Sequence, residues 1–208
     1  DRTLGEGVPA VRSDHEQGGR LIARQLIDSG ARHVVLVGGP RSQFAEATTF
    51  PTIRYHLTVE RMLADAGIAC DYVEAGIVAD ICAHEATARA IFERYSDVDA
   101  LVGSDLVASV ALQEALRRGI SVPRDLQIIA YDGTFMAETA GMRLTAVRQD
   151  FPAVAAALAS RMDSQIAADN GTTSAAAAEG GNAVAANGGQ STSEDIISVT
   201  LIPGETTR

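Results

Sequence analysis

The stretch GISVPRDLQIIAYDG, residues 119–133, decides the fold class. Residues 126–131 are rich in isoleucine and end on an aromatic residue, which is typical of a buried β-strand. The pair Asp132-Gly133 follows at once and predicts a sharp exit from that strand. A carboxylate at the carboxyl end of a buried strand lies where open α/β sheets bind their ligands. The stretch therefore predicts an α/β sheet and makes Asp132 the first candidate for a ligand contact.

Strand and helix patterns alternate along the rest of the chain. Apolar runs predict further strands at 33–39, 70–75, 99–105, 144–149 and 196–204, and helical periodicity predicts helices at 15–29, 53–66, 83–95, 106–118 and 151–167. Gly30, Gly67 and Gly119 stand where three of these helices are predicted to end. Continuous apolar strands that alternate with helices indicate a doubly wound parallel sheet, covered on both faces.

Composition excludes several classes of protein. The net charge of −10, without any Lys/Arg-rich run, argues against a nucleic-acid-binding surface within these 208 residues. No apolar run approaches the roughly 20 residues of a membrane span. Cys70 and Cys82 lack metal-ligand or CxxC spacing, which favours reduced, packed thiols in a cytoplasmic protein. The first residues show no signal-peptide pattern and no starting methionine, so we expect the middle of a longer cytoplasmic chain.

Catalytic motifs are missing from the sequence. It contains no GxSxG, HExxH, Walker or GxGxxG pattern. The four histidines have no spacing that suits a metal, and we expect each to be solvated or to cap a helix: His15, His33, His56 and His84. The sequence therefore predicts neither an enzyme nor a bound metal or cofactor.

Three polar residues stand at the carboxyl end of a predicted parallel strand or just beyond it: Asp105, Asp132 and Gln149. Because such strand ends open into one crevice, we expect these side chains to bind hydroxyl groups of a small ligand. Asp105 has a second interpretation, as the cap of the helix that begins near Leu106, and we prefer it for this residue. No strong helix pattern follows Asp132, which favours the crevice.

Residues 169–193 break the alternation. They consist of small and polar residues with Val184 as the only large apolar one, so they cannot bury enough surface to offset their ordering entropy. We expect a flexible surface insertion.

Residues 8–40, 99–133 and 144–151 resemble the effector-binding domain of the lactose-repressor/galactose-repressor family of bacterial transcription regulators. The combination Gly-Ile-x-Val-Pro-x-Asp-Leu with Tyr-Asp five residues later, at 119–132, carries the resemblance. It implies a periplasmic-binding-protein-like (type I) domain of two lobes that close on an effector, with the N-terminal lobe incomplete. Residues 1–30 and 148–168 would belong to that lobe, and 31–147 and 194–208 to the C-terminal lobe.

By the same resemblance, Asp132 and Gln149 contact effector. Ser104 and Asp105 stand where the family usually has Asn-Asp, and Arg54 is the nearest match to an effector-binding arginine, one position out of register. Leu57 replaces a family glycine. Because of these departures, the effector could be a sugar, a nucleobase or another polar metabolite. Of the three, we expect a sugar.

The implied protein is a homodimeric regulator that changes its operator affinity when the effector binds. Its operator DNA would be bound through an N-terminal helix-turn-helix that this chain lacks, and no membrane partner is expected. The alternative is an extracytoplasmic sugar- or solute-binding protein of the same fold, which would carry a signal peptide in place of the DNA-binding segment.

Overall fold

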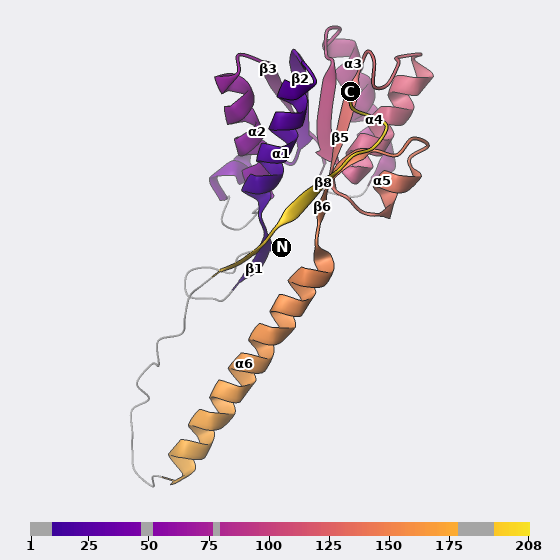
Figure 1. The fold of residues 1–208 in the computed structure, drawn as a ribbon. Coiled ribbons are helices and arrows are strands. Elements are labelled where there is room, and N and C mark those ends of the chain that lie inside the picture. The colour runs from indigo at the N-terminus through magenta and orange to yellow at the C-terminus, as the bar shows by residue number, and fades with distance from the viewer. Residues whose placement is uncertain (1–9, 47–51, 77–79, 179–193) are drawn as a thin grey trace.

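A computed structural model describes residues 10–46, 52–76, 80–178 and 194–208 (Figure 1). The elements follow in the order β1 (Val11–Ser13), α1 (His15–Asp28), β2 (His33–Gly38), a 3₁₀ turn (Arg41–Glu46), α2 (Ile53–Asp65), β3 (Ala69–Glu74), α3 (Ile81–Arg94), β4 (Ala100–Ser104), α4 (Asp105–Arg117), β5 (Gln127–Asp132), α5 (Phe135–Thr139), β6 (Thr145–Gln149), α6 (Phe151–Ala178), β7 (Asp195–Ile197) and β8 (Val199–Ile202). Among the described residues, no helix is long and apolar enough to cross a membrane.

The strands form two separate sheets. The larger has the order β3-β2-β4-β5-β6-β8, and all its pairs are parallel except β6 with β8. The smaller consists of β1 and β7, which pair in parallel. The predicted doubly wound parallel sheet is confirmed, with an antiparallel strand at one edge. We call the larger sheet with its helices the large unit, and β1, β7 and α6 the small unit.

Alternating side chains of each central strand enter two different cores. In β2, Val34 and Leu36 pack with α1 and α2, whereas Val35 and Val37 face the core that contains α3 and α4. Figure 1 shows the two helix layers on opposite sides of the sheet. Burial on both faces explains why these strands are apolar throughout. Gly30, Gly67 and Gly119 follow α1, α2 and α4 with positive φ, as their predicted helix-ending role requires.

Helix α1 belongs to the large unit by packing, which corrects the predicted assignment of residues 1–30 to the other lobe for the part from His15 onward. Ile22 and Leu26 are fully buried in the same core as Leu36 of β2 and Ile129 of β5. The chain therefore leaves the small unit at Asp14, between β1 and α1. The later crossings fall at Asp150, between β6 and α6, and at Ser198, between β7 and β8.

The structure differs from the predicted elements at three further places. Residues 169–178 continue α6 as a helix where an insertion was expected, and the four alanines at 175–178 have a high helix propensity. Residues 179–193 lie outside the described part of the chain. The predicted strand at 196–204 is divided into β7 and β8, which belong to different sheets. The short helix α5 follows Asp132 after a two-residue turn and has too few residues to show a period.

Both cysteines are free, as expected, but Cys82 is exposed rather than packed.

Candidate functional site

A chain of hydrogen bonds joins the two units at the carboxyl ends of their strands. Ser13, the last residue of β1, donates its hydroxyl to Gln149 Oε1 at 2.7 Å. Gln149, the last residue of β6, donates Nε2 to Asp132 Oδ1 at 2.7 Å. Asp132 ends β5, the strand next to β6. Two of the three residues predicted from strand ends therefore meet, because parallel strands bring their carboxyl ends to one edge of the sheet.

Asp132 has an unusual backbone and an unusual carboxyl group. Its φ of 108° lies in a region that non-glycine residues rarely adopt, and such strain is concentrated at functional sites. Burial and, after it, the nearby Asp105 carboxylate raise the pKa of Asp132 to about 6, although the hydrogen bond from Gln149 opposes the rise. In the described part of the chain, Asp132 Oδ2 accepts no hydrogen bond. This oxygen can accept one from a ligand hydroxyl.

Asp105 stabilises the turn after β5, and Ser104 takes the capping role that was predicted for Asp105. The Asp105 carboxylate accepts from Gly133 N at 3.1 Å, Thr134 N at 2.6 Å and Thr134 Oγ1 at 2.7 Å. The Ser104 hydroxyl caps α4 by accepting from Val107 N. Asp105 is the first residue of α4, so its side chain can cross to the neighbouring strand end. Asp105 thus supports the loop that begins at Asp132.

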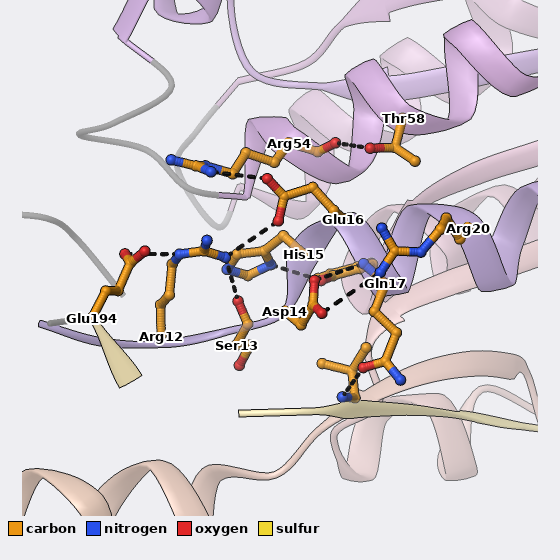
Figure 2. A network of polar contacts seen from close by, with 12 residues as sticks. Arg12, Ser13, Asp14, His15, Glu16, Gln17, Arg20, Arg54, Thr58 and Glu194 are labelled. Carbon is orange, nitrogen blue, oxygen red and sulfur yellow. Dashed lines mark hydrogen bonds and ion pairs between the residues drawn. The ribbon is translucent and has the colours of Figure 1, made fainter. Parts of the chain in front are cut away.

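Arg54 lies in the first turn of α2 and forms an ion pair with Glu16 of α1, with Nη1 at 2.8 Å from Oε1 (Figure 2). The same carboxylate reaches Arg12 of β1, whose Nη1 lies 3.5 Å from Glu16 Oε2. Arg12 also pairs with Glu194 at 2.8 Å and is 4% exposed. We call these four residues the junction ion pairs: Arg12, Glu16, Arg54 and Glu194. They connect the small unit to α1 and α2 of the large unit.

Two histidines lie in a buried stack beside the site, which corrects the expectation that they are solvated or capping. His15 Nδ1 and the Tyr131 hydroxyl share a hydrogen bond of 2.7 Å, and His15 is fully buried. Tyr131 stacks on Tyr55 at 3.9 Å between ring centroids, and Tyr55 stacks on His56 at 3.8 Å. Burial lowers the pKa of His15 to about 4, with Arg12 as a further cause, and lowers that of His56 to about 3. Both rings are therefore uncharged at neutral pH.

The other two histidines also differ from that expectation. His33, at the start of β2, lies between Asp71 and Asp97, at 2.9 Å and 3.0 Å, and is therefore paired. These two hydrogen bonds raise its pKa, although burial opposes the rise. His84 is buried in α3.

Several residues of the site were not singled out from the sequence: Arg12, Ser13, His15, Glu16, Tyr55 and Tyr131. A signal existed for the first four, because the polar run RSDHE, residues 12–16, covers the end of β1 and the start of α1. It was weak, since β1 has only three residues. Tyr55 and Tyr131 look like ordinary core residues in the sequence, and only the packing brings them together.

The site residues include both an acceptor and a donor for a hydroxylated ligand. Asp132 offers a free carboxylate oxygen, and Arg54 has a buried Nε without a hydrogen-bond partner in the part of the chain that the structure describes. One accepts and the other donates, as sugar-like hydroxyl groups require. No cluster of metal-binding side chains occurs among the described residues.

Several known proteins are similar to this chain. The periplasmic binding protein-like domain family matches residues 23–182. The ribose operon repressor of Bacillus subtilis (strain 168) is 35% identical over 135 residues, which cover 64% of this chain and 38% of the repressor. The sucrose operon repressor of Streptococcus mutans is 28% identical over 155 residues, 74% of this chain and 46% of that one. The chain thus spans less than half the length of either relative.

A solved structure has the same fold as this chain. The regulator of the LacI family from Arthrobacter sp. FB24, in complex with lactose, superimposes with a TM-score of 0.77 at 19% identity, over 100% of this chain and 68% of its own. The family match covers most of the chain, and the sequence relatives carry the same assignment. The chain therefore belongs to the periplasmic binding protein-like domain family, and the two relatives named above are operon repressors.

Proposed function

We propose that this chain is the effector-binding part of a transcription regulator, and that its effector is a small neutral sugar. The chain Ser13–Gln149–Asp132 carries the proposal, because it joins the two units through the residues expected to contact effector. The names of the relatives support it: two are repressors of a ribose and a sucrose operon, and a solved neighbour holds lactose. They favour a cytoplasmic regulator over the extracytoplasmic binding protein that the fold also allows.

The proposed mechanism is a shift between two arrangements of the units. The chain passes between them at three single-residue links, Asp14, Asp150 and Ser198. Such links can act as hinges, because a few terminal residues of secondary-structure elements absorb most of a domain rotation. A sugar that binds Asp132 in the large unit and replaces part of the hydrogen bonding to Ser13 in the small unit would favour one arrangement. In a homodimer with DNA-binding segments, that shift would change operator affinity.

Among the remaining candidates, we assign Arg54 to the effector site and Asp105 and Ser104 to its support. Arg54 offers a donor at the junction of the units, whereas the oxygens of Asp105 are already used by the turn at Gly133 and Thr134. A sugar is accordingly expected to touch Asp132, Gln149 and Arg54.

Titration calorimetry and saturation-transfer NMR with ribose, sucrose, cellobiose and lactose test the proposal. We expect binding of at least one of these sugars, and Asp132→Ala should weaken it by about 1–3 kcal/mol, since it leaves ligand hydroxyl groups unpaired. The matched control is Asp65→Ala, at an exposed position of α2. Failure of all four sugars to bind, or equal affinity for Asp132→Ala and wild type, would contradict the assignment.

A further inference from the structure

Every arginine at the junction of the units already has an acidic partner. Arg12 pairs with Glu194 and Glu16, Arg54 with Glu16, and Arg20 with Asp14 at 3.6 Å (Figure 2). Arg148, beside the turn after β5, pairs with Glu138 and donates Nε to Gly133 O at 3.2 Å. The described residues of this region therefore offer an incoming anion no unpaired guanidinium.

Glu16 has a special place among these partners because one carboxylate serves two arginines. Its Oε1 lies 2.8 Å from Arg54 and its Oε2 lies 3.5 Å from Arg12, so both oxygens face cations. Although burial opposes ionisation, the hydrogen bond from Arg54 and the charge of Arg12 hold the pKa of Glu16 below its ordinary value. The carboxylate is therefore charged at neutral pH and compensates Arg54.

We propose that Glu16 is a specificity-determining residue, which restricts the effector site to uncharged hydroxylated ligands and excludes phosphorylated or carboxylated ones. The inference rests on the proposed effector site. It deepens that proposal by naming the charge class of the ligand from this chain's own residues.

The physical reason is the different demand that neutral and anionic ligands make on Arg54. A neutral hydroxyl accepts a hydrogen bond from the buried Arg54 Nε and leaves the Glu16 pair in place. A phosphate seeks the whole guanidinium group and must displace Glu16 or lie next to it. If the phosphate displaces Glu16, the Glu16 carboxylate loses its cationic partner. If the phosphate lies next to Glu16, two negative charges are brought together. The carboxylates of Asp132 and Asp105 add further repulsion on the side of the large unit.

Inorganic phosphate is the first probe, because it tests Arg54 without any assumption about sugars. Its binding is measured by calorimetry and by the shift in melting temperature, for the wild type and for Glu16→Gln. We expect negligible binding to the wild type and a gain of about tenfold or more for Glu16→Gln, a difference of ~1.4 kcal/mol. The double variant Glu16→Gln/Arg54→Gln should lose the gain. Glu138→Gln, which removes the partner of Arg148, is the matched control and should show none.

In the phosphate titrations, the inference would be overturned by phosphate binding to the wild type as tightly as to Glu16→Gln, or by a gain that survives in the double variant. Circular dichroism reports whether Glu16→Gln is folded. If it is not, the wild type alone decides, because competition of phosphate with a bound neutral sugar would contradict the inference and lack of competition would support it.

Ribose and ribose 5-phosphate separate this inference from the proposed function. If the wild type binds ribose more tightly than ribose 5-phosphate, and Glu16→Gln shows a smaller preference, the result supports both the proposed function and the role of Glu16. A phosphate gain in Glu16→Gln without binding of any neutral sugar would support the charge selection by Glu16 and contradict the proposed effector. Tighter binding of ribose 5-phosphate than of ribose by the wild type would contradict the selection while leaving a sugar-binding site.

Discussion

The large and small units use similar side chains in opposite environments. Leu36 of β2 and Ile129 of β5 are fully buried between sheet and helices, whereas Leu158, Met162 and Ile166 of α6 are 44%, 61% and 55% exposed. The large unit covers both faces of six strands and has a core of its own. The described part of the small unit has two strands of three residues each and one helix, too little to cover these apolar side chains of α6. Stability in this chain therefore resides in the large unit, while the small unit supplies one side of the candidate site.

The largest effect is expected when the same change, leucine to alanine, is made once in each unit and the two losses of stability are compared. Leu36→Ala removes a fully buried side chain and should lower the free energy of unfolding by about 2–5 kcal/mol, through lost burial and the cavity left behind. Leu158→Ala, on the exposed face of α6, should change it by less than about 0.5 kcal/mol. Urea unfolding followed by circular dichroism measures both. Equal losses would mean that α6 is packed as tightly as the sheet.

The pH dependence of stability tests Asp132, at the junction of the units. Its raised folded-state pKa, about 6, means that the folded protein binds this proton more tightly than the unfolded chain. The associated stability is fully present below about pH 4 and is lost as pH rises through 6, by roughly 1–3 kcal/mol. Asp132→Asn should remove this component, and asparagine tolerates the positive φ.

The unfolding free energies of wild type and Asp132→Asn are measured at pH 4, 5, 6 and 7, and their difference is taken at each pH. The contributions of the other carboxyl groups cancel in this difference. The variant should gain stability relative to wild type as pH rises. A difference that is constant with pH would show that Asp132 is ionised in an ordinary environment.

The hydrogen bond between α1 and β5 allows a test of whether α1 belongs to the large unit. Tyr131→Phe deletes the hydroxyl that shares a 2.7 Å hydrogen bond with His15 and leaves the stacked ring in place. We expect a loss of about 1 kcal/mol in unfolding free energy, the usual net value of one buried hydrogen bond. If the loss appears in the global unfolding transition, α1 unfolds together with the sheet. A separate early transition for α1 would contradict the unit boundary at Asp14.

The smallest effect is expected for the ion pair between Arg161 of α6 and Asp195 of β7. This pair is only partly buried, and ion pairs near the surface contribute little to stability, so Asp195→Asn should leave the global unfolding transition unchanged. It should accelerate amide hydrogen exchange in α6, because local opening depends on such contacts where the core is thin. Exchange measured by mass spectrometry checks this, and protection of α6 equal to that of β5 in the variant would contradict it.

Much of the large unit could be predicted from the sequence because its signals are local and repeated. Apolar runs gave β2, β4 and β5, and helical periodicity with a following glycine gave α1, α2 and α4. The small unit gave weaker signals: β1 and β7 have three residues each, and α6 continues into an alanine-rich stretch that resembled a loop by composition. Composition reports whether a segment can bury apolar surface, but the prediction took no account of the helix propensity of the alanines at 175–178.

In the candidate site, too, some residues could be predicted from the sequence and others could not. Asp132 and Gln149 were predicted because both stand at the carboxyl ends of parallel strands, where open α/β sheets bind their ligands. The bond of Asp105 to Gly133 and Thr134 and the pairing of Arg54 with Glu16 connect elements that are far apart in the chain, and no spacing in the sequence indicates them. The assignment of α1 failed for a related reason, since an amphipathic helix shows that it has a partner but not which one.

The sequence by itself thus determined the fold class, the strand ends that carry polar groups and the family, because hydrophobic period, turn residues and motif spacing are properties of neighbouring residues. Only the tertiary structure decided which unit α1 joins, where the chain crosses at Asp14, Asp150 and Ser198, and which carboxylate neutralises Arg54. Those features depend on distances between segments that are remote in sequence, and charge compensation in particular is fixed within a few ångströms by packing.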